Sequence, residues 1–252
     1  MTNNHIKYFA MQQSAVDLNC EARDFVGTEN RVVISKLHDR RKKYIKSPNF
    51  CKFVCYGYAV VASVDKKIED FIGNFIKDRI GFRCFEGYGI LSKEFIKYNK
   101  QIGTVEYYLP DLNKSRITNP DFDVKIYIED EIRRFYSDDR FHMALGYFPE
   151  NSDRRDVIAV AGYDSDKKIM GIAGASNDAD KMWQVGIDVM PEFRNRGVAA
   201  VLVSIITDEI LKKNIIPFYG TAWSHIASKN VAVNSGYKPA WVELSAYDIE
   251  ID

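Results

Sequence analysis

The stretch Ile187–Ala199 reads IDVMPEFRNRGVA and decides most of what the sequence tells about the fold. Its first residues form an apolar pattern typical of a β-strand, and Pro191 ends that pattern. An amphipathic helix pattern follows at once, from Val198 to about Lys213. We therefore expect a strand, a tight loop and a helix start, in that order.

A loop of this kind is suited to binding an anion. The first N–H groups of a helix have no partner inside the helix, and the aligned peptide dipoles make that end partly positive. Gly197 and Ala199 leave the backbone accessible, and Arg194 and Arg196 add fixed positive charge. The pattern favours a phosphate or pyrophosphate site, although an ordinary packed helix start with two solvated arginines fits the same residues.

The overall charge of the chain argues against two classes of partner. The 252 residues contain 35 Lys and Arg and 35 Asp and Glu, so the formal net charge is zero. Such a chain has no global field that attracts nucleic acid or an anionic membrane. The local cluster Arg40–Lys43 is interpreted as a solvated helix face, and binding of nucleic acid through it is the weakest hypothesis.

The sequence also favours a soluble, cytoplasmic protein. The first residues lack the apolar core of a signal peptide, and no apolar run is long enough to span a bilayer. The four cysteines, Cys20, Cys51, Cys55 and Cys84, lack the paired spacing of a zinc site. We expect them to be small buried side chains, and we expect no metal.

The periodicity divides the chain into two modules. Residues 1–45 are expected to be helical, and residues 113–120 are polar and interrupted by Pro120. The predicted domains are therefore an N-terminal α/β module over 1–112, a linker over 113–121 and a second domain over 122–252. The first module is expected to continue with strands Phe53–Tyr56, Ala59–Val64 and Thr104–Leu109 and helices Lys66–Arg79 and Ser92–Gln101.

The second module has the clearer pattern. It is expected to contain a helix over Glu129–Tyr136, a helix from Gly197, and a helix capped by Ser224 that stops at Gly236. The expected strands are Val124–Ile128, Val157–Gly162, Ile169–Ala175, Met182–Val189, Pro217–Thr221 and Trp241–Ile251.

This order, together with three stretches, resembles the GNAT superfamily of N-acetyltransferases. Val189–Ala199 is similar to the cofactor motif of that family, and Ser228–Tyr237 is similar to its later helix, which closes with a Gly-aromatic pair. The hairpin over Val157–Ala175 is similar to the two preceding strands. The resemblance covers roughly residues 122–250, and Thr221–Ser224 looks more loosely like the zwittermicin-resistance-type subgroup.

The resemblance implies an α+β (mixed αβ) fold, with a central mixed sheet flanked by helices and an added N-terminal α/β module. It implies acetyl-CoA as cofactor, held in a V-shaped split between the strand at Ile187–Val189 and the strand at Pro217–Thr221. It assigns the N–H of Ile187 to the oxyanion of the transferred acyl group. The residues it assigns to the cofactor are Val189, Arg194, Asn195, Arg196, Gly197, Val198, Ala199, Ser224 and Ser228.

The groups that move the proton are less clear from the resemblance. The family's Glu on the motif strand falls near Trp183 and Gln184, and its Tyr on the last helix falls at Ala232. Asp188 is the first substitute for the base, His225 the second and Tyr219 the third, each with a structural role as the alternative. Proximity alone also supplies much of the rate in such transfers.

The sequence therefore predicts direct, acetyl-CoA-dependent transfer of an acetyl group to the amine of a small molecule. The alternative is a non-catalytic acyl-CoA-binding or regulatory protein with a degenerate GNAT fold. The acceptor, the proton path and the oligomeric state, a homodimer included, stay open.

Overall fold

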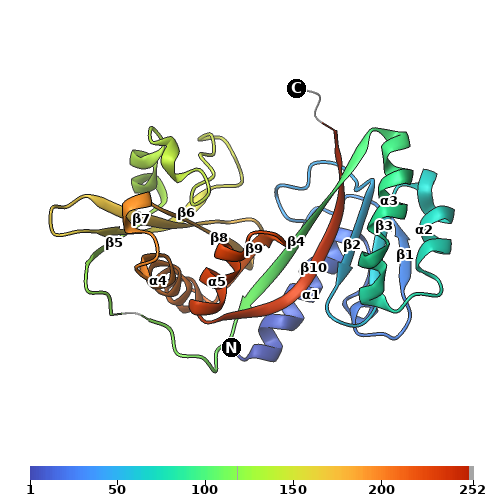
Figure 1. Cartoon of the computed structure of the whole chain (residues 1–252), viewed down its shortest axis with the longest axis horizontal. Helices are drawn as coiled ribbons and strands as arrows, with labels where there is room; N and C mark the ends of the chain where they lie inside the picture. Colours follow the sequence, from blue (N-terminus) through green and yellow to red (C-terminus); the bar gives the residue numbers. More distant parts are fainter. Residues whose placement is uncertain (118, 250–252) are drawn as a thin grey trace. The chain divides into compact units, whose positions relative to one another are not determined.

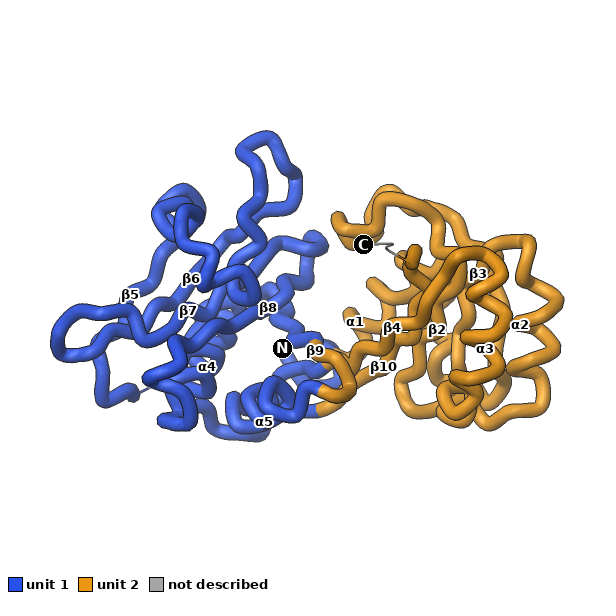
Figure 2. The backbone as a smooth tube through the Cα atoms, turned by 45° about the horizontal axis from the view of Figure 1, so that its top comes forward, with its two compact units in different colours: residues 1–6, 108–220, 225–238 blue, residues 7–107, 221–224, 239–252 orange. Residues whose placement is uncertain are grey.

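The computed structural model describes residues 1–117 and 119–249. Its contacts divide the chain into two units, which Figure 2 shows in different colours. Unit 1 contains residues 1–6, 108–220 and 225–238, and unit 2 contains residues 7–107, 221–224 and 239–252. The chain therefore passes from one unit to the other several times, and neither unit is a single continuous segment.

Unit 2 combines helices with the strands β1 (Arg31–Ile34), β3 (Val60–Val64), β2 (Cys51–Cys55), β10 (Tyr237–Asp248) and β4 (Lys100–Pro110), in that spatial order. The β1–β3 pair is parallel, and the β3–β2 and β2–β10 pairs are antiparallel. The helices are α1 (Asn3–Leu18), α2 (Glu69–Ile76) and α3 (Tyr88–Phe95), with short 3₁₀ turns at Ala22–Phe25, Lys66–Ile68, Gly81–Gly87 and Ile96–Tyr98. Strands β4 and β10 and helix α1 each have a few residues in unit 1.

Alternate residues of these strands face two different environments. Phe53, Ala62 and Leu244 pack with α2 and α3 in a core that also contains Ile72 and Phe95, all of them fully buried. The intervening residues of β2 and β10, among them Lys52 and Glu243, turn to the opposite face. Lys52 and Glu243 are charged residues in largely buried strands, so each needs an oppositely charged partner on that second face.

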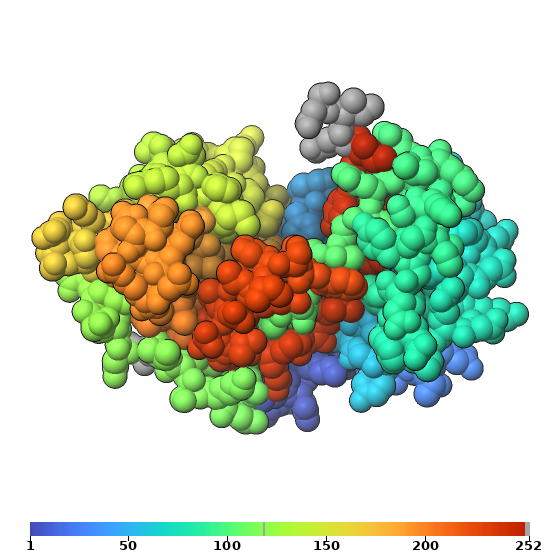
Figure 3. Space-filling view, in the orientation of Figure 1, coloured from blue at the N-terminus to red at the C-terminus, as the bar shows by residue number. Residues whose placement is uncertain are grey.

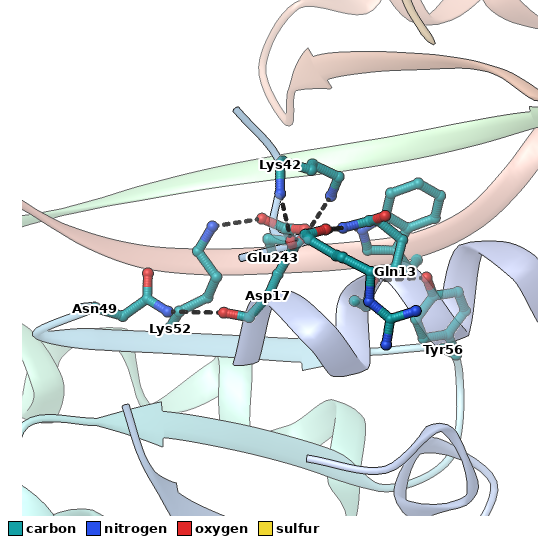
Figure 4. A network of polar contacts seen from close by, with 10 residues as sticks. Gln13, Asp17, Lys42, Asn49, Lys52, Tyr56 and Glu243 are labelled. Carbon is teal, nitrogen blue, oxygen red and sulfur yellow. Dashed lines mark hydrogen bonds and ion pairs between the residues drawn. The ribbon is translucent and has the colours of Figure 1, made fainter. Parts of the chain in front are cut away.

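Figure 4 shows those partners as a buried network of ion pairs and hydrogen bonds. Nζ of Lys42 lies 3.0 Å from Oδ2 of Asp17, on α1, and both side chains are about as buried as core residues, at 2% and 3% exposure. Nζ of Lys52 lies 3.1 Å from Oε2 of Glu243, whose other carboxylate oxygen accepts from Trp241 Nε1 at 3.0 Å. The network joins α1 and the segment around Lys42 to the sheet.

Unit 1 is built on the strand order β9 (Ile216–Ala222), β8 (Met182–Val189), β7 (Ile169–Ser176), β6 (Asp156–Tyr163) and β5 (Asp123–Ile128). The β5–β6, β6–β7 and β7–β8 pairs are antiparallel, and the β8–β9 pair is parallel. Helices α4 (Val198–Lys212) and α5 (Ile226–Asn234) cover one face, and the 3₁₀ segments η5 (Glu129–Phe135) and η6 (Asp139–Phe141) lie over the other (Figure 1). A third short turn, η7 (Pro191–Phe193), precedes α4.

Helix α4 forms because its apolar residues recur on one side at helical spacing. Val198, Leu202, Ile206 and Ile210 are buried against the strands, and burying one such side chain contributes about 2 kcal/mol. The helix ends beside Lys212, a favourable place for a cation, and Asn214 then takes a left-handed conformation with φ of 57°.

Most of the expected elements of unit 1 are confirmed, including β8 with both of its predicted ends. The expected helix over Glu129–Tyr136 is present as the 3₁₀ segment Glu129–Phe135. One local prediction is wrong, because α5 begins after His225 rather than at a Ser224 cap. Within residues 1–45, the α-helix covers only Asn3–Leu18, a 3₁₀ turn follows at Ala22–Phe25, and Arg31–Ile34 is a strand because it pairs with β3. The expected mixed αβ fold with a mixed sheet and flanking helices is confirmed.

The predicted domain limits stay a prediction, and the contact units follow a different division. The C-terminal part of β10 pairs with β2, so residues 239–249 group with the N-terminal half. The predicted linker 113–121 falls in unit 1, except for Thr118, which lies outside the described residues together with positions 250 and 251 of the expected last strand.

The residues that the structure describes bear on two features, membrane-spanning helices and metal-binding groups of side chains. Over residues 1–117 and 119–249, none of the helices combines the length and the apolar character needed to cross a membrane. Within the same residues, no group of three His, Cys, Asp or Glu side chains is placed to hold a metal ion. Cys51, Cys55 and Cys84 are buried free thiols, as expected, whereas Cys20 is half-buried.

Candidate functional site

Within the described chain, the last residues of strand β8 have a partner strand on one side only. On the β7 side the register runs from Gln184 to Val189, and Met190 N–H donates to the Met170 carbonyl at 2.9 Å. On the β9 side the parallel register of the described residues covers Met182 to Val185 and ends at the pair Val185–Tyr219. The last four residues of β8 therefore extend beyond that ladder.

The backbone groups of this extension alternate in direction. Because Met190 bonds to β7, Asp188 also turns its N–H and C=O toward β7, and Ile187 and Val189 turn theirs to the β9 side. Nε of Arg194 donates to the Val189 carbonyl at 3.1 Å. The N–H groups of Ile187 and Val189 thus point to the β9 side of the strand, beyond the end of the β8–β9 ladder.

The loop after β8 leads directly to the start of α4. Asn195 and Gly197 both have positive φ, of 61° and 80°, a conformation that glycine adopts without strain. A Cβ at Gly197 would meet no atom within 4 Å, and residues 194–197 are exposed. Figure 3 shows this orange part of the chain at the surface of the face in view. The predicted loop is therefore open rather than covered by neighbouring side chains.

This loop presents several hydrogen-bond donors. The first bond of α4 runs from Val201 N–H to the Gly197 carbonyl at 3.1 Å, so Val198, Ala199 and Ala200 have no intrahelical acceptor. No acidic residue lies in the first turn, and Arg196 packs its guanidinium over the Phe193 ring at 5.7 Å. The donors and the two arginines make this end of α4 attractive to an anion.

Asp188 lies on the opposite face of β8 and holds a neighbouring loop. Its Oδ2 accepts from the N–H groups of Met143 and Ala144, each at 2.8 Å. Burial raises the pKa of the Asp188 carboxyl, although the two N–H bonds and the nearby positive charges act to lower it. The carboxylate thus has a clear structural role, whatever its part in proton transfer.

Two glycines allow that loop to lie against the strands. Gly174 and Gly186 are directly opposite each other in the β7–β8 register. A Cβ on Gly186 would lie 2.1 Å from the Met143 carbonyl oxygen, and one on Gly174 would lie 2.3 Å from that of Ala144. Any larger residue at either place would displace the loop from β8. Asp156 holds the same loop further along, at Gly146, because its carboxylate accepts hydrogen bonds from Gly146 N–H and Tyr136 Oη.

The remaining predicted residues lie around the start of α5. His225 is the exposed N-cap residue and makes no capping bond with its side chain, and Ser224 is exposed in the segment between β9 and α5. Ser228 is half-buried, and its Oγ lies 2.8 Å from Oη of Tyr219. Tyr219 is buried, so burial raises its pKa while the Ser228 bond lowers it. The hydroxyls of Ser228 and Tyr219 therefore engage each other.

The sequence analysis did not single out His142, which the fold brings near Asp188. Its Nδ1 lies 2.9 Å from the Asp139 carbonyl oxygen, which only accepts, so Nδ1 carries the hydrogen and Nε2 is a free acceptor. The ring is exposed, and the next residue, Met143, bonds to Asp188. Met143 and Asp188 are 45 residues apart in the sequence, so no local pattern predicts their contact.

Comparison with known proteins gives similarity at the level of structure. No family model and no curated protein match the chain. Several of the solved structures that it resembles are named as GNAT-family acetyltransferases. One is an acetyltransferase of the GNAT family from Colwellia psychrerythraea, at 12% identity and a TM-score of 0.41, over 58% of this chain and 57% of the other.

Two further structures show the range of the likeness. A GCN5-related N-acetyltransferase from Kribbella flavida has 12% identity and a TM-score of 0.49, over 98% of this chain and 96% of the other. A GNAT superfamily phosphinothricin acetyltransferase from Sinorhizobium meliloti, solved with AcCoA, has 16% identity and a TM-score of 0.31, over 34% and 59%. The matches thus span less than two-thirds of the Colwellia and Sinorhizobium chains. Because all three TM-scores lie below 0.5, the function proposed below is supported by the geometry of this chain.

Proposed function

We propose that this protein is an acetyl-CoA-dependent N-acetyltransferase acting on the amine of a small molecule. The observation that carries the proposal is the continuity of donors from β8 into α4. The N–H groups of Ile187 and Val189 lie outside the β8–β9 ladder, and those of Val198 to Ala200 lie outside the helix ladder. A ligand with a diphosphate at one end and amide groups along its length matches that series of donors.

The residues of the loop fit such a cofactor. Gly197 leaves open the space that a side chain would fill, and Arg194 and Arg196 supply charge beside the free N–H groups. We propose that Asn195 to Ala199 hold the diphosphate, that Val189 bonds to the amide-bearing arm, and that Ser228 completes the part of the site that lies in unit 1. When bound, acetyl-CoA supplies an activated acyl group.

The N–H of Ile187 is proposed to stabilise negative charge on the acyl oxygen. One correctly placed donor of this kind lowers the barrier of acyl transfer by about 3 kcal/mol. The donor is pre-positioned, because the β7 ladder on the other side fixes the direction of the strand. No movement of the backbone is then required at the moment of reaction.

The proton of the acceptor amine has three proposed recipients: Asp188, His225 and His142. Oδ2 of Asp188 already accepts two N–H groups, and its raised pKa reflects the cost of ionising there. The bond from Nδ1 of His142 to the Asp139 carbonyl fixes the ring and leaves Nε2 to accept a proton. The geometry therefore supports His142 best among the three. His142→Gln should therefore lower kcat, whereas His225→Gln should leave kcat close to that of the wild type.

Two measurements test the proposed function itself. Calorimetry should detect CoA binding, and incubation with acetyl-CoA and a panel of small amines should release free thiol. Binding without turnover on any amine would favour the alternative, a non-catalytic acyl-CoA-binding protein, for which the Asp188 bonds and the buried Ala232 provide the motive. Absence of CoA binding would refute both. Cytoplasmic location and a homodimer stay proposals without a structural test.

A further inference from the structure

The outer strands of unit 1 form a hollow far along the sequence from the α4 loop. A cavity of about 480 Å³ is lined by Asp123, Val124, Lys125, Tyr127, Arg134, Tyr163 and Lys167. Most of the lining residues belong to β5, the last strand in the order of this sheet, and the others to η5, β6 and the turn after β6. Its volume falls within the range of small-molecule sites.

Two tyrosines shape the hollow by leaning toward each other. Tyr127 and Tyr163 belong to neighbouring strands, and their register partners are Ala159 and Asp123. Between them stand Lys125 and Ala161, which face each other in the same register. The two hydroxyl oxygens nevertheless lie only 2.6 Å apart. The two rings therefore form an arch over Ala161 on β6, whose side chain is small.

The hydroxyl pair has one hydrogen to spare. One hydroxyl donates to the other, so the accepting hydroxyl keeps its own hydrogen for a third group. Neither hydroxyl has another hydrogen-bond partner within residues 1–117 and 119–249. Burial raises the pKa of Tyr163, so its hydroxyl keeps its hydrogen at neutral pH.

Positive charge converges on the same place from two elements. Nζ of Lys125, on β5, lies 4.8 Å from the centre of the Tyr127 ring, and Cζ of Arg134, on η5, lies 5.6 Å from it. Neither cation has a carboxylate partner among the described residues. The third cation, Lys167, pairs with Asp123, the one acidic side chain of the lining. Three positive charges against one negative charge leave the hollow with a net charge of two positive units.

We propose that this hollow binds a small phosphate-bearing anion. A phosphate oxygen would accept the spare hydroxyl hydrogen, and Arg134 and Lys125 would donate to the remaining oxygens. The Tyr127 ring offers an apolar wall beside them, which suits a phosphate attached to a flat or aliphatic group. This site is independent of the proposed transferase function, because it shares no residue with the α4 loop.

The test is calorimetric titration of the full-length protein with inorganic phosphate, pyrophosphate and AMP at low salt. The hollow is altered in the double variant Lys125→Gln/Arg134→Gln. The matched control, Lys181→Gln/Lys213→Gln, removes two exposed charges elsewhere on unit 1. Arg196→Gln separately reports binding at the α4 loop.

The proposal expects at least one probe to bind the wild type and the control with similar affinity. The Lys125→Gln/Arg134→Gln variant should bind it about tenfold or more weakly. Tyr163→Phe, which removes one hydroxyl of the arch, should weaken it less. Failure of all three probes to bind would overturn the proposal, and so would equal affinity in the wild type and the double variant. Because CoA is absent from the experiment, neither result depends on whether acetyl transfer occurs.

Discussion

The α4 loop of unit 1 and the Lys42 network of unit 2 use polar groups in opposite ways. Lys42 and Asp17 are almost fully buried, and each is bonded to the other or to the backbone. The α4 loop is exposed, and its first N–H groups have no acceptor in the helix. Satisfied polar groups hold elements together, whereas unsatisfied ones at an open surface are available to a ligand.

The largest effect should come from breaking the buried pair. Lys42→Ala leaves Asp17 without its ammonium partner inside the protein, and such a change costs about 3–5 kcal/mol of unfolding free energy. Chemical denaturation measures the loss. The exposed Lys77→Ala serves as control and should change stability by less than about 0.5 kcal/mol. A loss equal to that of the control would show that the pair does not hold unit 2.

The next effect concerns the open loop. Gly197→Glu introduces a carboxylate beside the free N–H groups and forces a non-glycine residue to φ of 80°, so CoA affinity should fall by about 100-fold or more. Gly197→Asn is the control, because Asn tolerates this conformation and is neutral. Unchanged affinity of Gly197→Glu for CoA in calorimetry would refute the assignment of the loop.

A smaller effect should follow from releasing the loop that Asp188 holds. Asp188→Ala leaves two N–H groups without an acceptor, at a cost of about 1–2 kcal/mol, and should speed amide exchange at Met143 and Ala144. Asp188→Asn keeps a carbonyl acceptor and should restore most of the protection. If Asp188→Asn retains both protection and acetyl transfer, the carboxylate acts as an anchor rather than as the base.

The smallest effect should be a dependence of stability on pH. Burial alone would raise the pKa of Glu243, but Lys52 and Lys42 outweigh it and hold that pKa below its usual value. A carboxyl with a lowered pKa adds stability above its unfolded pKa of about 4.3 and loses it as the pH falls. The free energy of unfolding of the wild type should therefore fall below about pH 4.5, and Glu243→Gln should remove part of that slope. An identical slope in both proteins would contradict this role.

Sequence patterns predicted the segment from β8 to α4 because each step there has a local cause. The strand pattern, Pro191, Gly197 and the helical spacing from Val198 all act within a few residues. The pairing of β10 with β2 and the strand β1 depend on partners far along the chain, and local periodicity carries no information on these.

The same distinction applies to the candidate site. The loop residues were predicted from their types and spacing, whereas the Asp188–Met143 and Tyr219–Ser228 contacts emerge only in the fold. Asp188 stays a candidate base because of its place in the motif strand. The fold adds that its side chain reaches Met143 and Ala144, which fits the structural role given as the alternative.

The central claim is that the start of α4 binds a diphosphate, and comparing CoA with pantetheine tests it most directly. The two compounds share the thiol arm, but pantetheine lacks the nucleotide and its diphosphate. In calorimetry on the wild-type protein, the account predicts that CoA binds about 100-fold or more tightly than pantetheine, and that Arg196→Gln narrows the difference. Equal affinity for the two compounds would contradict it.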